Sequence, residues 1–473
     1  MEEVRQQTSE RYKGKSCSLL IASSTNFANV NNNGNANYNN ASNSNGVRPI
    51  FRHHPKCRVI RGDASRKGSC NFPKGKLTFR RVADTSAALP RSIKMDILTV
   101  ANANNLIEAY RNSAKSGSWK SSVQKYGLNL LRNVYQTRKA LLSGKYTLKP
   151  CNVFTLSERG KARLIRSIHI SDRVIQRCLC DNVLLPSLKK YLIYDNGASL
   201  KNKGVNFTRK RIITHLAEYY KKYGRKGYIL QIDFSKFFDN IPHNIILSMF
   251  YKHIEDEGLR NLIEKIIQTF RIDISDYPEN YFNDKPFDAL AHRSHWSEKG
   301  LSFLNRSMGI GSQISQIGGI FYLSPIDNYC KIVKGCRFYG RYMDDIYIIH
   351  PNKDFLKNLL VEIKKLAEDI GAFINQKKTQ IVKLSHGFTF LKIKHFITPK
   401  GRIVRTLSRC NIVRERRKLK KFKRFLDSGE MTMPDIINQY NAWRGGNRRF
   451  DSYTTLKSFD RLFNKLFKKE VRK

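Results

Sequence analysis

The sequence predicts an α+β fold, and two kinds of pattern support that class. Residues 259–270 and 355–370 carry apolar side chains at the three- and four-residue spacing of amphipathic helices. Short apolar runs at 228–232, 336–339 and 346–349 have the length of buried strands and lie next to acidic residues. We therefore expect a sheet packed against helices, with carboxylates where its strands end.

The most informative of these acidic stretches is Tyr342-Met343-Asp344-Asp345. Gly340 and the acidic pair interrupt what otherwise reads as two short strands, so we expect the pair at the tip of a hairpin. Two adjacent buried carboxylates are costly unless a cation neutralises them, and their hard oxygens suit Mg²⁺. Taken alone, an Asp-Asp pair is more often an exposed turn.

A third carboxylate, Asp233, directly follows the apolar run 228–232. At the end of a buried strand it could converge with Asp344 and Asp345. Three carboxylates on neighbouring strands can hold two divalent ions about 4 Å apart. Such a pair of ions serves in-line phosphoryl transfer, because one ion activates a 3′-hydroxyl and both stabilise the developing charge.

The order of these acids along the chain resembles the palm of reverse transcriptases. Three more segments follow the family order: Gly160-Lys161-Ala162-Arg163 resembles the finger segment that meets the triphosphate, Asn375-Gln-Lys-Lys378-Thr379 resembles Leu-Asn-x-x-Lys-Thr, and Phe388-Thr-Phe390-Leu391 resembles the primer-grip hairpin. The resemblance covers roughly residues 104–470. It implies a right-hand polymerase with fingers, a palm containing an antiparallel sheet, and a helical thumb.

The resemblance also assigns a metal site. It implies that Asp233, Asp344 and Asp345 hold two Mg²⁺ ions, aided by the backbone carbonyl of Phe234. Mn²⁺ is expected to substitute for Mg²⁺. These residues form the predicted catalytic centre.

The resemblance further implies a nucleotide-binding set: Lys161, Arg163, Phe234, Phe238, Ile310, Gln316 and Lys378. The ring of Phe238 would pack under the sugar and exclude a 2′-hydroxyl, Lys161 and Arg163 would contact the triphosphate, and Lys378 would lie near the leaving pyrophosphate. Each has an ordinary alternative: a core phenylalanine, an exposed basic loop, or a surface lysine. Lys392 departs from the family, which carries glycine at that place in the primer grip, and this puts the fine geometry of the grip in doubt.

One segment indicates a subfamily. Met308-Gly-Ile310-Gly-Ser-Gln-Ile-Ser315-Gln316 resembles the Ile-Gly-x-x-x-Ser-Gln form found in diversity-generating retroelements. Retron, group II intron and retroviral enzymes usually carry Gln-Gly-x-x-x-Ser-Pro there. Ile310 and Gln316 would then shape the base-pair pocket, although either could be mere packing. Loss of a hydrogen-bonding side chain at 310 weakens discrimination, so low fidelity opposite template adenine is the hypothesis.

The amino-terminal region gives a second indication. Eleven asparagines lie between Asn26 and Asn45, and the simplest interpretation is a polar, disordered, low-complexity tail. Residues 25–51 also resemble a translated template repeat of a diversity-generating retroelement, because asparagine codons begin with two adenines. On that hypothesis residues 52–94 are translated spacer and Met95 is the true start.

The predicted organisation is therefore a disordered or non-native extension over 1–94, fingers and the start of the palm over 95–232, palm over 233–400, and a basic helical thumb over 401–473. Residues 271–307 look irregular and are interpreted as an insertion within the palm. Arg409 to Arg424 holds nine basic residues and one acid. A basic helix is usually a solvated face, but at this place the family has its thumb.

Composition agrees with a nucleic-acid partner. Lys and Arg number 87 against 38 Asp and Glu, a formal net charge of +49, which favours phosphate binding without choosing RNA over DNA. The nine cysteines form no Cys-x-x-Cys pair, so neither zinc nor disulfides are expected. No run of about 18 apolar residues is present, so no membrane span is expected and a cytoplasmic location is predicted.

Three function classes follow. The leading hypothesis is an RNA-directed DNA polymerase that copies a template-repeat RNA into cDNA with adenine-directed errors, using deoxynucleoside triphosphates and an RNA/DNA hybrid, with a small basic accessory protein as partner. The alternative is another cellular reverse transcriptase, of the retron or phage-defence kind. A non-catalytic nucleic-acid binder is disfavoured because all three acids are present.

Overall fold

The computed structural model describes residues 19–22, 26–30, 36–40, 95–115, 117–158, 161–276 and 300–471. The chain divides into two units, Met1–Ser92 and Ile93–Lys473. The first contains a three-stranded antiparallel sheet of β1 (Leu19–Ala22), β2 (Asn26–Val30) and β3 (Ala36–Asn40). Apart from these strands, the expectations for residues 1–94 lie outside the described residues, as does most of the insertion predicted at 271–307.

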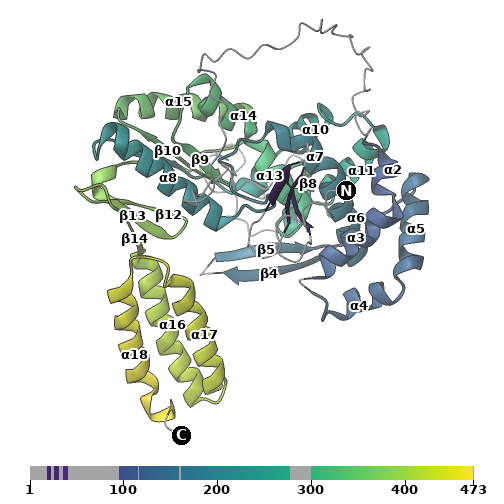
Figure 1. Cartoon of the computed structure of the whole chain (residues 1–473). Coiled ribbons are helices and arrows are strands. Elements are labelled where there is room, and N and C mark those ends of the chain that lie inside the picture. The colour runs from purple at the N-terminus through teal and green to yellow at the C-terminus, as the bar shows by residue number, and fades with distance from the viewer. Residues whose placement is uncertain are drawn as a thin grey trace, which may run out of the picture. The chain divides into compact units, whose positions relative to one another are not determined.

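A four-stranded antiparallel sheet is the centre of the second unit (Figure 1). Its strand order is β11 (Gln380–Lys383), β6 (Tyr228–Ile232), β10 (Asp345–His350) and β9 (Tyr339–Tyr342). β6 and β10 cover the predicted runs, whereas β9 begins at Tyr339 and not at Cys336. The mixture of this sheet with surrounding helices confirms the α+β class.

Gly340 lies inside β9, so the prediction that it interrupts the strand is wrong. It pairs across the sheet with Tyr347 of β10. A Cβ atom at 340 would lie 2.5 Å from the Tyr347 hydroxyl oxygen and 2.6 Å from the ring carbon that carries it. Glycine is needed here because the tyrosine ring lies against the β9 backbone, and not because the chain turns.

The two faces of the sheet pack against different helices, as the two-residue alternation of a strand requires. One face carries Leu230, Ile232, Ile346 and Ile348, which join the largest core cluster together with α15 (Lys353–Asp369). The opposite face carries Ile229, Tyr347 and Ile349, which pack with α8 (Val205–Tyr223). The sheet is therefore buried on both sides and can hold the residues at its end rigidly.

The helices predicted from apolar spacing are all present. Residues 259–270 correspond to α11 (Glu257–Gln268) and residues 355–370 to α15. Residues 170–188 form a further continuous helical segment. That segment consists of α6 (Ile170–Leu179), the π-helical turn η1 (Cys180–Leu184) and α7 (Leu185–Leu188). Its Cys178 and Cys180 are buried free thiols.

The other elements complete the second unit. Before the central sheet lie α2 (Ile97–Val100), α3 (Ala103–Ala114), α4 (Ser121–Leu128), α5 (Leu130–Leu142), the hairpin β4 (Asn152–Glu158) and β5 (Lys161–Ser167), and η2 (Lys189–Tyr191). Within and after it lie α9 (Phe237–Asn240), α10 (His243–Tyr251), β7 (Ile272–Asp273), η3 (Ile274–Asp276), β8 (Phe303–Leu304), α13 (Gln313–Tyr322), α14 (Ser324–Asn328), η6 (Tyr329–Val333) and η7 (Leu384–His386).

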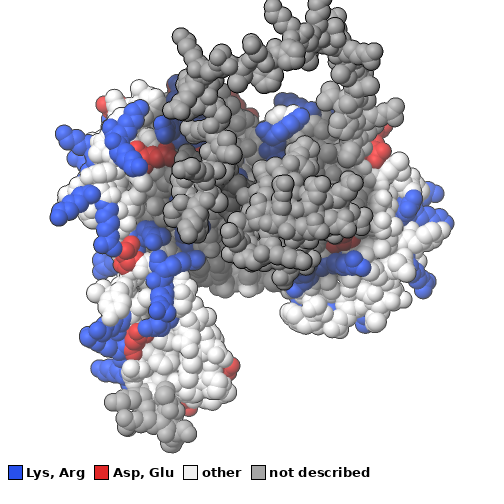
Figure 2. Space-filling view, in the orientation of Figure 1, with Lys and Arg blue, Asp and Glu red and all other residues white. Residues whose placement is uncertain are grey.

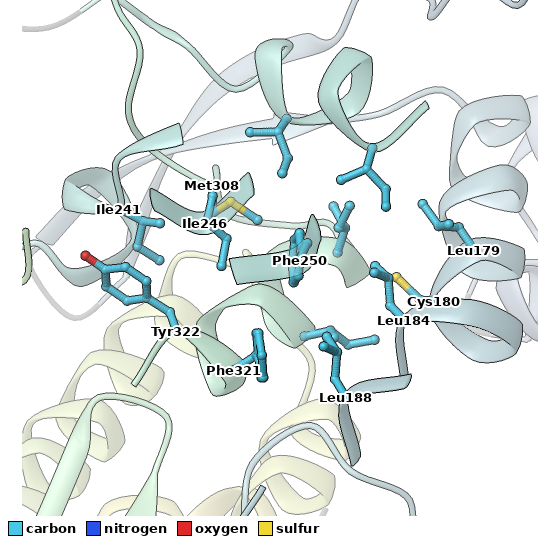
Figure 3. Close-up of a cluster of buried hydrophobic side chains, with 14 of the residues drawn as sticks. Leu179, Cys180, Leu184, Leu188, Ile241, Ile246, Phe250, Met308, Phe321 and Tyr322 are labelled. Carbon is cyan, nitrogen blue, oxygen red and sulfur yellow. The ribbon is translucent and has the colours of Figure 1, made fainter. Parts of the chain in front are cut away.

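A close-up of the main core shows how segments far apart in sequence meet (Figure 3). Leu184 and Leu188 lie in the same cluster as Phe250 of α10 and Phe321 of α13. The rings of Phe250 and Phe321 stack at 6.0 Å between centroids. The helical segment 170–188 is thereby fixed against α13, the helix that follows the Ile310 loop.

The carboxyl-terminal part is a three-helix arrangement of α16 (Arg409–Asp427), α17 (Met433–Asn447) and α18 (Tyr453–Val471) (Figure 1). It follows a three-stranded antiparallel sheet of β12 (Phe388–Phe390), β13 (Ile393–Ile397) and β14 (Ile403–Leu407). The apolar core of this part includes Leu426, Ile436, Ile437, Tyr440, Trp443, Phe459, Leu462, Phe463 and Leu466. None of the described helices is long and apolar enough to cross a membrane.

Acid should destabilise the second unit through His395, whose ring stacks on Phe388 in β12. Burial lowers the pKa of His395 to about 4, against a backbone hydrogen bond at Ile393 that raises it. Because the unfolded histidine titrates near pH 6.5, its contribution to stability is complete above that pH and is lost as the pH falls toward 4. Between pH 7 and pH 5 the free energy of unfolding should fall by about 1–2 kcal/mol from this group.

Urea denaturation at several pH values measures this effect. The His395→Leu variant has similar volume and no titrating group, so its stability should fall less over the same range. Equal losses in the variant and the parent protein would show that this ring does not carry the acid sensitivity.

Candidate active site

The three predicted acids lie at one end of the central sheet. Ile346 of β10 pairs with Ile232 of β6, so continuing the register by one residue puts Asp345 opposite Asp233. Side chains in directly opposed positions of an antiparallel pair have Cβ atoms about 5 Å apart. Asp344 lies in the adjoining turn between β9 and β10, beside Met343, whose φ is +56°.

The electrostatics of this end are those of repelling carboxylates. Burial is the largest cause that raises the pKa of Asp345, to about 7, and the negative charges of Asp344 and Asp233 contribute to the same rise. Burial also raises the pKa of Asp344, again with Asp233 adding to the rise. The nearby charge of Lys378 opposes both shifts. The cluster is therefore a place where added positive charge is strongly favoured.

Lys378 is a cation that pairs directly with one of these acids. Its Nζ atom lies 2.7 Å from Oδ2 of Asp233, and its side chain is 53% exposed. The backbone brings this about, because the amide of Asn375 donates to the carbonyl of Asp233 at 2.8 Å. The segment 375–379, predicted from resemblance, is thus attached to the strand end that carries the first acid.

The carboxylates are adjacent but do not enclose an ion by themselves. In the described part of the chain, no three His, Cys, Asp or Glu side chains are gathered tightly enough to hold a metal ion. The Asp233 carboxylate is instead directed to Lys378. The chemistry of the donor set nevertheless suits a hard divalent cation, since all three groups supply carboxylate oxygens, and burial together with neighbouring negative charge disfavours the ionised form of Asp344 and Asp345.

Two phenylalanines follow Asp233. Phe234 is buried, and its backbone forms an isolated antiparallel bridge to Ile374. Phe238 is partly buried, lies 5.2 Å from the ring of Phe237, and accepts a hydrogen bond from the amide of Met308 at its carbonyl. The Phe238 backbone is therefore joined directly to the start of the Ile310 segment.

The Ile310 segment is a tight loop leading into α13. Gly309 and Gly311 have φ of +63° and +124°, a backbone region that favours glycine. A Cβ at Gly311 would lie 3.4 Å from the carbonyl oxygen of Arg166, so the loop runs against β5. Ile310 is partly buried. Gln316 is exposed on α13 and accepts a weak hydrogen bond of 3.5 Å from the Ser199 hydroxyl.

Lys161 and Arg163 belong to β5, where they pair with Glu158 and Leu156 of β4. Their side chains lie outside the described part of the structure. The hairpin itself nevertheless approaches the Ile310 loop through Arg166, as described above. Because the side chains of Lys161 and Arg163 are not described, their contacts with the triphosphate stay a prediction.

Lys392 has a left-handed backbone conformation. In the turn between β12 and β13, Leu391 and Lys392 have φ of +45° and +69°. This left-handed region is one that glycine occupies without strain. The turn is held from outside, because Arg209 donates to the Leu391 carbonyl at 2.6 Å and Asn411 donates to that of Lys392 at 2.8 Å.

The basic helix predicted at 409–424 is α16. Leu419 and Phe422 face the helical core, while most of its cations are exposed: Arg409, Arg414, Arg416, Arg417, Lys420, Lys421 and Arg424. Figure 2 shows Lys and Arg gathered toward one side of the carboxyl-terminal helices. Glu415, the one acid of that stretch, is buried, and burial raises its pKa. The exposed face of α16 is therefore almost purely positive.

Two residues that the sequence did not single out lie against the site. A Cβ at Gly319 of α13 would be 3.0 Å from the Phe238 ring and 3.2 Å from the Met343 sulfur. Arg341, one residue before Tyr342, is fully buried and donates to the Met343 carbonyl at 2.8 Å. Two sequence features could have identified these residues: the Gly318-Gly319 pair in an apolar helix, and a charged residue inside a buried strand.

Three carboxylates at the end of an antiparallel sheet, with a basic helical part after it, define a polymerase-like class of site. Residues 150–395 match the family of reverse transcriptases (RNA-dependent DNA polymerases). The chain belongs to this family. Reverse transcriptase domains use divalent metal ions, in agreement with the donor set found here.

Individual relatives are more distant. The chain is 25% identical to the COX1/OXI3 intron 2 protein of Saccharomyces cerevisiae over 206 residues, which cover 37% of this chain and 24% of that protein. Telomerase from Candida albicans, in complex with a fragment of telomeric RNA, is 14% identical to this chain with a TM-score of 0.39. The match covers 69% of this chain and 55% of the telomerase chain. Apo telomerase from Candida tropicalis is 16% identical with a TM-score of 0.33, covering 52% and 47%.

The repulsion among the acids predicts that divalent cations stabilise the protein. Millimolar Mg²⁺ should raise the Tm, and a concentration 10 to 100 times the Kd corresponds to about 1–3 kcal/mol. Asp345→Asn should lose most of this shift, because it removes one of the repelling charges. The measurement is thermal denaturation with Mg²⁺ or with NaCl at equal ionic strength.

Asp354→Asn is the matched control, since Asp354 is an exposed carboxylate on α15 paired with Lys357. That variant should respond to Mg²⁺ as the parent protein does. An unchanged Mg²⁺ response in Asp345→Asn would mean that cations stabilise the protein somewhere else.

Proposed function

We propose that the chain is an RNA-directed DNA polymerase that extends a primer along an RNA template. The observation that carries this proposal is the pairing of β6 with β10, which brings Asp233 opposite Asp345 in a chain of the reverse transcriptase family. The positive face of α16 supports a nucleic-acid substrate. In this scheme residues 95–232 form the fingers and first palm strand, 233–400 the palm, and 401–473 the thumb.

Asp233, Asp344 and Asp345 would hold two Mg²⁺ ions, with the Phe234 carbonyl as a further oxygen donor. Bound there, the ions would activate the primer 3′-hydroxyl and stabilise the charge that develops on the phosphoryl oxygens. Lys378, now paired with Asp233, would be released from the carboxylate and would neutralise the leaving pyrophosphate. Its exposed, flexible side chain is suited to such a change of partner.

The other proposed contacts surround the nucleotide. Lys161 and Arg163 of β5 would contact the triphosphate, and Phe238 would exclude a 2′-hydroxyl from the sugar site. Ile310 and Gln316 would border the base pair. The hydrogen bond between Met308 and Phe238 supports this grouping, because it links the loop at the base to the residue at the sugar.

Alanine at any one of the three acids should lower cDNA synthesis by about a hundred- to a thousandfold, the range for removing one electrostatic stabiliser of a transition state. The assay is single-nucleotide primer extension on an RNA template, with thermal denaturation to establish folding. Asp354→Ala should keep full activity. A folded variant at any of the three positions that still synthesises cDNA would contradict the proposal.

For the subclass, we propose a diversity-generating retroelement enzyme, which copies a template-repeat RNA with errors at adenines and works with a small basic accessory protein. The Ile310 loop supports this, because an apolar side chain there offers no hydrogen bond to the nascent pair. A near-copy of codons 25–51 that differs at adenines, in the neighbouring DNA, would accompany this function. A retron-like or phage-defence enzyme is the alternative if no such copy exists.

Ile310→Gln should lower misincorporation opposite template adenine by about 10- to 100-fold, because a side chain that hydrogen-bonds the correct pair penalises the wrong one. Steady-state insertion of each deoxynucleotide opposite adenine measures the ratio. Ile310→Leu, which stays apolar, should keep the parental error rate. Equal error rates in the glutamine and leucine variants would show that residue 310 does not determine fidelity.

A further inference from the structure

A fully buried ion pair lies directly behind the hairpin that carries Asp344 and Asp345. Arg341 of β9 and Asp327 of α14 are both 0% exposed. Nη2 of Arg341 lies 2.5 Å from Oδ2 of Asp327, and its Nε lies 2.8 Å from Oδ1. The Tyr339 hydroxyl donates to the same carboxylate at 2.5 Å. Both charges are therefore well satisfied inside the core.

The remaining donors of Arg341 are used on two backbone carbonyls. Nη1 donates to the carbonyl of Met343 at 2.8 Å, and Nη2 donates to that of Ile320 in α13 at 2.7 Å. Met343 is a non-glycine residue in the left-handed region, which is costly unless its surroundings hold it there. The carbonyl that Arg341 holds belongs to the peptide that leads into Asp344.

The backbone of Arg341 is fixed as well. Its amide donates to the Asp195 carbonyl at 3.1 Å, and its carbonyl accepts from the Gly197 amide at 2.9 Å. These bonds cover the outer side of β9, which is an edge strand of the central sheet. Arg341 therefore cannot move without moving the strand, the hairpin tip or α13.

The same guanidinium sets the separation between the acids and α13. Gly319, next to Ile320, is where Phe238 and Met343 both approach the helix, at 3.0 and 3.2 Å from a would-be Cβ. A change in the distance from the hairpin to α13 would therefore shift the proposed sugar contact and the acids together. A buried ion pair adds little to stability compared with apolar residues of the same size. The consequence of this ion pair is that it fixes the distance between the hairpin and α13.

We propose that Arg341 and Asp327 are positioning residues for DNA synthesis: the pair holds the Met343 carbonyl and α13 so that Asp344 is presented to the metal ions and the nucleotide at a fixed spacing. This inference rests on the proposed function of the three acids. It assigns no contact with substrate to either residue.

The test is the double variant Asp327→Leu/Arg341→Met, which removes both charges and keeps apolar volume in the core. It should fold with a Tm near that of the parent protein, and it should bind template–primer with the same Kd. Its kcat should fall at least about tenfold, and its half-saturating Mg²⁺ concentration should rise several-fold. Arg341→Lys, which keeps the charge but loses the fork of donors, should show the same kinetic change in milder form.

Lys334→Met/Glu362→Gln is the matched control, because it removes an ion pair of 2.6 Å that lies away from the hairpin. It should leave kcat and the Mg²⁺ requirement unchanged. A folded double variant at 327 and 341 with parental kcat and Mg²⁺ requirement would overturn the inference, provided that Asp344→Ala is inactive in the same assay. An active Asp344→Ala would overturn the proposed catalytic site and this inference with it. If both Asp327→Leu/Arg341→Met and Arg341→Lys fail to fold, the pair is needed for folding. The positioning role is then rejected in favour of a structural one.

Discussion

Repulsion among three carboxylates is the constraint on which this structure depends. Asp233 directly follows β6, Asp345 is the first residue of the adjacent strand β10, and Asp344 lies in the turn between β9 and β10. Left to themselves such charges would separate; burial, with the neighbouring negative charges adding to it, raises the pKa values of Asp344 and Asp345. The fold keeps them together because the strands behind them are buried on both faces, and because Lys378 adds a compensating charge.

The rest of the second unit can be understood as support for that strained end. α8 and α15 hold the sheet from opposite faces, so the strand ends cannot splay. The loop 309–311 and α13 are connected to the site by the Met308–Phe238 hydrogen bond on one side and by the Arg341 guanidinium on the other. The loop 309–311, Phe238 and the acids are therefore parts of one connected arrangement, and a change at one is expected to alter the position of the others.

Much of this arrangement could be predicted from sequence, because it depends on local pattern. The apolar spacing of α11 and α15 and the run before Asp233 fixed these elements to within a few residues. Gly340 was misjudged, since its reason is the Tyr347 ring on another strand, which no local pattern reveals. The Arg341–Asp327 pair and the Lys378–Asp233 pair depend in the same way on tertiary contacts, across 14 and 145 residues of sequence.

The central claim is that the three acids act together on a pair of divalent ions. The most direct measurement is anomalous diffraction from Mn²⁺ in a crystal of the protein with template–primer and a non-hydrolysable deoxynucleotide. The account predicts two anomalous peaks about 4 Å apart, bounded by the carboxylates of Asp233, Asp344 and Asp345. An ordered nucleotide accompanied by no peak at these residues, or by peaks held by other side chains, would contradict it.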